Sequence, residues 1–279
     1  MDVKRAIIES DFKFNKRFGQ NFIEDKALLQ KIVEGAGVVE TDVVLEIGVG
    51  AGTLTRALSE KAKRVVGYEI DLNLKPVLER TLSGVENAEV VFRDFMKQEM
   101  AAVEALMGEE YLVVANLPYY VTTPILMKLI EQAKNCKRIV VMVQKEVADR
   151  FCAKCATADY GAVTVAIDVT ADAYKIMDVK RENFYPVPNV DSAVVRIDIN
   201  KNKYNPLSKK AFRDAVRCAF SSRRKTLQNN LINTYKIPRF KAEALLDKAG
   251  VPLLARGETL STEEFVKLSD ILFESGIIE

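Results

Sequence analysis

The sequence predicts a doubly wound α/β domain with a mostly parallel sheet, followed by a small all-α domain. Short, nearly all-apolar runs alternate with helical patterns from residue 43 to residue 153, which is typical of parallel strands covered by helices on both faces. A glycine-rich turn follows the first run, where open α/β sheets bind their ligands. Beyond residue 206 the apolar residues recur only at helical spacing, so this part is expected to be helical.

The order of the elements follows from the same patterns. A helix is expected at 26–36, a helix at 144–153, and between them five strands separated by helices, at 43–47, 65–68, 89–92, 112–115 and 139–143. Two further strands, at 163–169 and 193–199, are expected to form an antiparallel pair at one edge of the sheet. A polar break at 200–206 marks a boundary, which gives a first domain of residues 1–204 and a helical domain of residues 205–279.

Length and composition are those of an ordinary globular protein. The chain has 279 residues, 48% of them hydrophobic and 29% charged, and no apolar run approaches the length of a membrane span. The first residues lack the apolar core of a secretory signal. We therefore expect a cytoplasmic protein that acts as a monomer and has no membrane partner.

Cysteine and histidine usage limits the possible chemistry. Four cysteines in a chain without a secretory signal are expected to be reduced thiols. Cys152 and Cys155 have the spacing of metal ligands, but no second pair and no histidine completes a tetrahedral site, so no metal is expected. The absence of histidine excludes Ser/His/Asp and Cys/His nucleophile schemes, so any reaction must need little proton abstraction.

Two segments are rich in positive charge. The chain has 41 basic and 39 acidic residues, and segment 201–241 holds 12 of the basic residues and one of the acidic residues. The formal charge of this segment is therefore +11, and that of the remaining residues is −9. This asymmetry indicates a polyanionic partner, although a solvated, lysine-rich surface gives the same count. Residues 1–26 are basic and carry four phenylalanines, so part of this segment is expected to fold back onto the domain or onto a ligand.

The glycine-rich turn indicates a nucleoside ligand. Gly48 and Gly50 let the backbone turn sharply and approach a ligand that a Cβ would keep away, and the next helix offers free N–H groups. The spacing Gly-x-Gly-x-Gly differs from the dinucleotide pattern Gly-x-Gly-x-x-Gly. It favours a ligand without a pyrophosphate, such as S-adenosylmethionine; a purely structural glycine turn is the alternative.

Acidic residues follow the next two strands. Glu69 lies about twenty residues beyond Gly48, where an acid commonly binds both ribose hydroxyls. Asp94 follows the third strand and can accept a hydrogen bond from an adenine amino group. Helix capping is the alternative for both residues.

The tetrapeptide Asn116-Leu117-Pro118-Tyr119 follows the fourth strand and indicates a reaction at an amine. Pro118 holds Leu117 extended, so the Asn116 side chain and the Leu117 carbonyl can point the same way. Two acceptors facing an exocyclic adenine nitrogen would favour a pyramidal nitrogen with its lone pair directed at a methyl group. Tyr119 offers a ring on which the base can stack. A strand-ending turn is the alternative for this tetrapeptide.

The motifs together resemble the ribosomal RNA adenine dimethylase family, in particular its small-subunit enzymes. The resemblance covers nearly the whole chain and is carried by the Asn-Leu-Pro-Tyr motif and by segments 16–23, 144–150, 160–161, 184–192 and 220–227. Ile23 stands where leucine is usual in the family, and Val49 stands where proline is usual, which is expected to loosen the glycine loop slightly. The resemblance implies a Rossmann-like class I methyltransferase sheet.

The same resemblance implies roles for individual residues. It implies that S-adenosylmethionine is bound by Asn21, Ile23, Gly48, Glu69, Asp94 and Asn116, in addition to the close approach expected at Gly50. It implies that Asn116, Leu117, Pro118 and Tyr119 hold the target adenine and that Phe184 packs against it. The residues expected to contact RNA phosphates are Lys16, Arg17, Arg223, Arg224 and Lys225.

Our hypothesis is methyl transfer to N6 of two neighbouring adenosines in a small-subunit ribosomal RNA hairpin loop. The nearest alternative is the large-subunit dimethylase that confers macrolide resistance, which shares the catalytic motifs. A DNA adenine methyltransferase is disfavoured because nothing resembles its target-recognition domain, and a nicotinamide dehydrogenase by the glycine spacing and the missing histidine. A catalytically silent RNA-binding assembly factor remains the alternative from another functional class.

Overall fold

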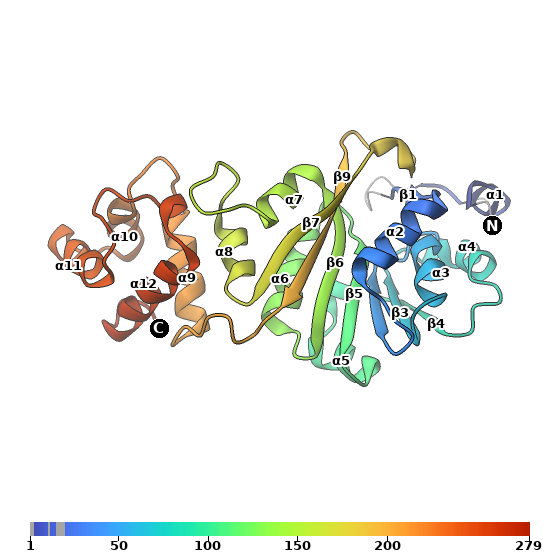
Figure 1. Ribbon diagram of the computed structural model, residues 1–279, viewed down its shortest axis with the longest axis horizontal. Helices are drawn as coiled ribbons and strands as arrows, with labels where there is room; N and C mark the ends of the chain where they lie inside the picture. Colours follow the sequence, from blue (N-terminus) through green and yellow to red (C-terminus); the bar gives the residue numbers. More distant parts are fainter. Residues whose placement is uncertain (1–2, 11, 15–19) are drawn as a thin grey trace. The chain divides into compact units, whose positions relative to one another are not determined.

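The computed structural model describes residues 3–10, 12–14 and 20–279. The chain divides into two compact units, drawn in Figure 1. The first comprises Met1–Ala148 and Tyr174–Ile199, and the second comprises Asp149–Ala173 and Asn200–Glu279. Segment 149–173 thus groups with the helical unit, although it precedes residue 204. The domain boundary at residue 204 stays a prediction.

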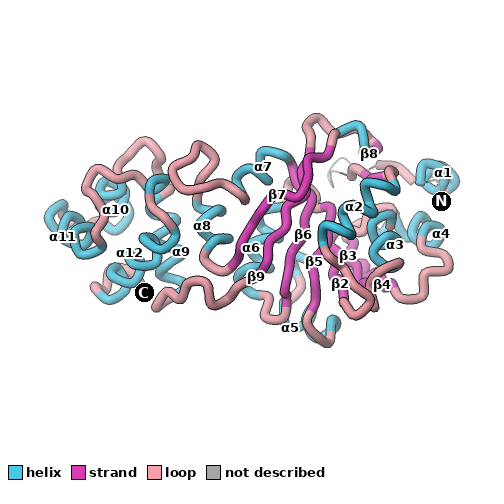
Figure 2. Tube along the Cα trace, in the orientation of Figure 1, coloured by secondary structure: helices cyan, strands magenta, loops and turns pink. Residues whose placement is uncertain are grey.

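A seven-stranded sheet organises the first unit, in the order β4-β3-β2-β5-β6-β9-β7. Five strands run parallel, and β9 runs antiparallel to β6, which confirms the doubly wound sheet and its antiparallel edge. Figure 2 draws the strands of this sheet in magenta. Every residue of the interior strand β2 is buried, so both faces of the sheet are covered there. The strands are β2 (Val43–Ile47), β3 (Arg64–Glu69), β4 (Ala88–Phe92), β5 (Tyr111–Asn116), β6 (Cys136–Gln144), β7 (Ala171–Val179) and β9 (Ser192–Ile199).

Helices follow the strands and place their apolar sides on the sheet. The helix α2 begins after the N-cap Asp25 and ends at Gly37, a left-handed residue, at the bounds expected from the sequence. In Figure 1, α2 and α3 lie side by side, and both contribute to one apolar cluster with the sheet. The helices here are α1 (Val3–Glu9), α2 (Lys26–Ala36), α3 (Thr53–Ser59), α4 (Lys75–Thr81), α5 (Met100–Met107), α6 (Thr122–Gln132) and α7 (Lys145–Phe151).

The strand expected at 163–169 is wrong: this segment is the helix α8 (Ala162–Asp168), and the strand β7 begins at Ala171. The sequence Val-Thr-Val-Ala-Ile-Asp-Val has a period of two, but Val165 and Val169 are also four residues apart, on one side of a helix. Both pack into the apolar cluster of the second unit. Thr164 secures the first turn by accepting from the Gly161 N–H at 3.2 Å.

The N-terminal segment folds back, as expected, where the structure describes it. Its strand β1 (Phe22–Ile23) pairs antiparallel with β8 (Phe184–Tyr185), so that Ile23 faces Phe184 in register. The rings of Phe12 and Phe14 lie 6.3 and 5.6 Å from the Phe22 ring. These contacts place residues 20–23 beside the carboxyl ends of the sheet strands.

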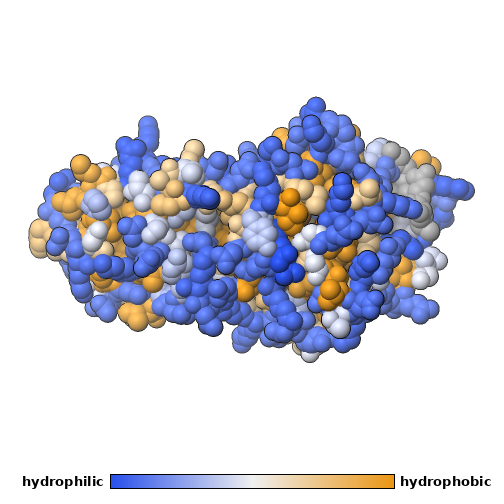
Figure 3. Space-filling model, viewed as in Figure 1, coloured by the Kyte–Doolittle hydropathy of each residue, from blue (hydrophilic) through white to orange (hydrophobic). Residues whose placement is uncertain are grey.

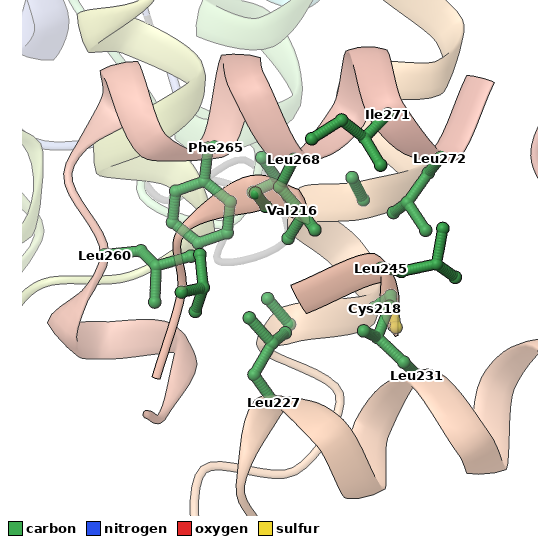
Figure 4. Packing of buried hydrophobic residues seen from close by; sticks show 14 of the residues in the cluster. Val216, Cys218, Leu227, Leu231, Leu245, Leu260, Phe265, Leu268, Ile271 and Leu272 are labelled. Carbon is green, nitrogen blue, oxygen red and sulfur yellow. The ribbon is translucent and has the colours of Figure 1, made fainter. Parts of the chain in front are cut away.

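The second unit is helical and has its own core. Figure 4 shows apolar side chains, among them Val216, Leu231 and Phe265, that meet in one cluster from several helices. Together with α8, this unit contains α9 (Lys209–Ala219), α10 (Leu227–Tyr235), α11 (Arg239–Ala249) and α12 (Thr262–Glu274), as the helical spacing predicted.

The surface is largely polar on the face shown in Figure 3. Among the described residues, no helix combines the length and the apolar character needed to cross a membrane.

Candidate active site

A pocket opens at the carboxyl ends of β2, β3 and β5. Its empty space is about 730 Å³, open solvent at the mouth included. The structure brings most of the sequence-predicted site residues together on its walls, namely Asn21, Ile23, Gly48, Gly50, Glu69, Asn116, Leu117, Pro118 and Tyr119.

The glycine loop requires its glycines. Gly48 and Gly50 have φ angles of +82° and +57°, a left-handed conformation that L side chains rarely adopt. A Cβ at Gly50 would lie 2.9 Å from a ring carbon of Phe22. The loop is therefore closely packed against the N-terminal strand, and no side chain at Gly50 separates the two.

Glu69 organises the turn at the end of β3. Its carboxylate accepts three backbone N–H groups, from Gly50, Ile70 and Asp71, each at 2.8 Å. Burial raises the pKa of Glu69, and the three hydrogen bonds oppose that rise. The capping role that was the alternative for Glu69 is filled by Asp71, which accepts from Asn73 N at the start of the next turn. A carboxylate has about four acceptor positions, so Glu69 keeps capacity for a ligand hydroxyl.

Asp71 also attaches the N-terminal segment, a role that sequence reasoning missed. Its Oδ2 accepts from Gln20 Nε2 at 2.7 Å, and Gln20 lies on the pocket wall. No local pattern could have found a contact between residues 51 positions apart.

Glu46 is a second residue that sequence reasoning missed. It lies in β2 with 1% of its surface exposed, lines the pocket, and accepts a hydrogen bond from Thr55 Oγ1 at 2.6 Å. Burial raises the pKa of Glu46 to about 8. An acid within an otherwise apolar strand, two residues before the glycine loop, was the available clue.

Asn116 is the last residue of β5, and a hydrogen bond fixes the nitrogen of its side-chain amide. Its Nδ2 donates to the Asn21 carbonyl oxygen at 3.1 Å, and the Leu117 N–H donates to Met142 O at 3.2 Å. Between residues that the structure describes, no hydrogen bond ends on Asn116 Oδ1 or on Leu117 O. Asn116 and Leu117 both line the pocket, and among the described residues neither of these two oxygens receives a hydrogen bond.

Tyr119 is half-buried and fixed at its hydroxyl. The phenol oxygen lies 2.8 Å from Ser192 Oγ, and Ser192 is fully buried at the start of β9. Burial raises the pKa of Tyr119, and the bond to Ser192 opposes that rise. The antiparallel strand thus determines where this ring lies.

Asp94 lies on a neighbouring hollow, which shares Gly48, Ile70, Pro118 and Tyr120 with the first pocket. One of its oxygens accepts from Met96 N at 2.9 Å, so Asp94 does cap the turn that follows. Its other oxygen lies 3.9 Å from Lys97 Nζ.

Phe184 is not on either wall. It is 3% exposed, faces Ile23 across the β1–β8 pair, and belongs to the apolar cluster around α2. Its contact with a target base stays a prediction.

The residues expected to contact RNA have different surroundings. Lys16 and Arg17 lie outside the described residues. Arg223 donates from Nη2 to the carbonyl oxygens of Ala158 and Tyr160, each at 2.8 Å, within the second unit. Arg224 and Lys225 are exposed, just before α10.

The cysteines are free, and among the described residues no three Asp, Glu, His or Cys side chains gather closely enough to hold a metal ion.

Comparisons with known proteins agree with this geometry. Residues 11–274 match the model of the family "Ribosomal RNA adenine dimethylase". The chain is 44% identical to ribosomal RNA small subunit methyltransferase A of Bacillus licheniformis, covering 97% of this chain and 95% of that protein. It is 42% identical to the protein of the same name from Clostridium acetobutylicum, covering 96% and 98%.

Solved structures extend the comparison. A dimethyladenosine transferase from Plasmodium falciparum has a TM-score of 0.77 at 28% identity, covering 92% of this chain and 99% of that one. The 23S rRNA methyltransferase ErmE has a TM-score of 0.67 at 32% identity, covering 91% and 100%. On the family model and on relatives that match nearly its full length, this chain belongs to the ribosomal RNA adenine dimethylase family.

Proposed function

We propose that this protein transfers methyl groups from S-adenosylmethionine to N6 of two adjacent adenosines in a hairpin loop of small-subunit ribosomal RNA, giving dimethyladenosines. Family membership supports the reaction. The names of the relatives that are 44% and 42% identical support the small subunit as the target.

The pocket fits the methyl donor. The backbone of the glycine loop lines the pocket through Gly48 and Gly50, and Glu69 on the same lining retains an acceptor for the ribose. Asp94 on the adjoining hollow is the acceptor for the adenine amino group. S-adenosylmethionine supplies a methyl group on a positively charged sulfur, which is a good leaving group.

The single observation that carries the mechanism is that no hydrogen bond from the described part of the chain ends on Asn116 Oδ1 or Leu117 O. In the first transfer they would accept both N–H groups of the target amine, and in the second its one remaining N–H, so that the lone pair is held toward the methyl carbon. The proton that the methylated nitrogen loses at each transfer would pass to water. Positioning of this kind can supply much of a rate enhancement. It needs no strong base, in agreement with a chain that contains no histidine.

Two further groups serve the RNA. The ring of Tyr119, held through Ser192, would stack on a base taken out of the helix. Arg224 and Lys225 would contact phosphates. We also propose that the protein acts as a monomer in the cytoplasm, which sedimentation and cell fractionation would test, and that it requires no metal, so activity should survive EDTA.

The experiment measures the transfer of a labelled methyl group to small and large ribosomal subunits from cells that lack dimethylases. Mass spectrometry of the RNA then identifies the modified nucleotides. We expect two adjacent dimethyladenosines in small-subunit RNA, with Asn116→Ala as the inactive control. Modification confined to large-subunit RNA would favour the macrolide-resistance alternative. Binding without modification of either subunit would favour a silent assembly factor.

A further inference from the structure

Lys128 is a buried cation bonded to backbone carbonyl groups. It lies in the middle of α6 with 9% of its surface exposed. Its ammonium group donates to three backbone carbonyl oxygens: Phe95 O at 3.1 Å, Met96 O at 3.0 Å, and Gln98 O. In the part of the chain that the structure describes, no ion pair joins Lys128 to an acid.

The three carbonyls belong to the turn that carries Asp94. This turn, residues 94–98, contains the 3₁₀ helix Phe95–Lys97, and Asp94 is its N-cap. Gln98 Nε2 donates to Asp94 O at 3.0 Å, which closes the turn on itself. The Phe95 ring has two close neighbours, the Lys128 Nζ at 5.3 Å and the Tyr68 ring at 5.6 Å.

The bonding of Lys128 is complete and specific. An ammonium group has three donors, and here each has its own carbonyl acceptor. Burying a charge is costly unless such partners are supplied, so a buried lysine is a poor choice for packing alone. It is a good choice for fixing a turn, because its loss would remove a donor from three carbonyl oxygens of that turn, of which Phe95 O also accepts from the Gln98 N–H at 3.1 Å.

We propose that Lys128 is a positioning residue for the methyl donor, because it holds Asp94 where that carboxylate can accept from the adenine amino group. This inference rests on the role proposed for Asp94. The helix that carries Lys128 begins at Thr122, whose hydroxyl donates to Pro118 O of the Asn116–Tyr119 motif at 3.0 Å. One helix therefore anchors both the turn at the adenine hollow and the motif at the target base.

The test compares Lys128→Met with Glu104→Met. Glu104 is also 9% exposed and also makes three hydrogen bonds, accepting at Oε1 from Lys134 N, Asn135 N and the Tyr111 hydroxyl. These contacts lie at the amino ends of β5 and β6, opposite the pocket. Both variants should lower the melting temperature.

Calorimetry then measures the binding of S-adenosylmethionine and of 5′-methylthioadenosine, which keeps the adenosine and lacks the amino acid. We expect Lys128→Met to lower the affinity for both ligands at least tenfold, and Glu104→Met to change either affinity by no more than about twofold. If Lys128→Met does not fold, Lys128→Gln, which keeps two donors, gives the same comparison. Equal losses in the two Met variants would overturn the proposal, because stability alone would then explain them.

The variant Asp94→Ala distinguishes a failure of the positioning role of Lys128 from a failure of the adenine contact proposed for Asp94. We expect Asp94→Ala to weaken binding of both ligands, and Lys128→Met to add little further loss in that background. Additive losses would overturn the positioning role and leave the site of Asp94 intact. An Asp94→Ala protein that binds both ligands normally would overturn the adenine contact and, with it, this inference.

Discussion

The side-chain nitrogen of Asn116 donates a hydrogen bond to the carbonyl oxygen of Asn21, 3.1 Å away. This contact joins the end of a central strand to the N-terminal segment, 95 residues earlier in the chain. It occupies the nitrogen branch of the Asn116 amide, so the oxygen branch is the one available to a ligand. The N-terminal segment is therefore part of the site.

Replacing Gly50 with alanine should block methyl donor binding. The new Cβ would be strained at a φ of +57° and would lie 2.9 Å from Phe22, and a left-handed non-glycine residue alone costs about 1–2 kcal/mol. We expect affinity for S-adenosylmethionine to fall at least tenfold, measured by calorimetry. Gly84→Ala is the matched control, since Gly84 has a φ of +76° and nothing within 4 Å. Equal effects of the two changes would contradict the account.

Tyr119→Phe and Ser192→Ala should raise KM for RNA to the same extent. Each removes the hydrogen bond between the two hydroxyls, which is typically worth about 0.5–1.5 kcal/mol. We expect KM for RNA to rise several-fold in either variant, with unchanged affinity for the methyl donor. The double variant should be no worse than the single ones. Additive effects would show that the two residues act independently.

Glu46 should make stability fall as pH rises. Its pKa is raised from 4.5 to about 8 in the folded protein, so between these values the folded state binds more protons than the unfolded state. The loss can reach about 1.4 kcal/mol per pH unit for one proton. We expect Glu46→Gln to be progressively more stable than the wild type from pH 5 to pH 8, by urea denaturation. A constant difference across that range would contradict the raised pKa.

Arg224→Ala/Lys225→Ala should weaken RNA binding and its dependence on salt. The slope of log K against log salt should fall by about 0.7–0.9 for each phosphate that the variant no longer binds. Lys267→Ala, which removes an exposed charge of α12, serves as the control. Arg223→Ala should chiefly destabilise the second unit, because Arg223 bonds two of its carbonyl groups. RNA binding unchanged at every salt concentration in the double variant would remove these residues from the interface.

The sequence predicted the elements whose determinants are local. The helix α2 has its cap, its apolar spacing and its terminal glycine within one short stretch, and its bounds are confirmed. Segment 163–169 was predicted wrongly because its pattern fits both periods, and only packing of Val165 and Val169 in the second unit decides between them.

The residues of the site also divide into those that the sequence could place and those that it could not. Residues at the carboxyl ends of strands, such as Gly48 and Asn116, could be placed from the sequence because parallel strands share one functional edge. The partners that hold them could not, because they come from distant parts of the chain: Asn21 for Asn116, and Ser192 for Tyr119. No local pattern records such contacts.

The most direct test of the mechanism is the single-turnover rate of methyl transfer by Asn116→Ala with saturating RNA and methyl donor. Loss of one preorganised hydrogen-bonding group at a reacting centre typically costs about 10²–10³ in rate. We expect a fall of that size, with RNA affinity close to that of the wild type. A rate within threefold of the wild type would contradict the claim that Asn116 Oδ1 and Leu117 O hold the target amine.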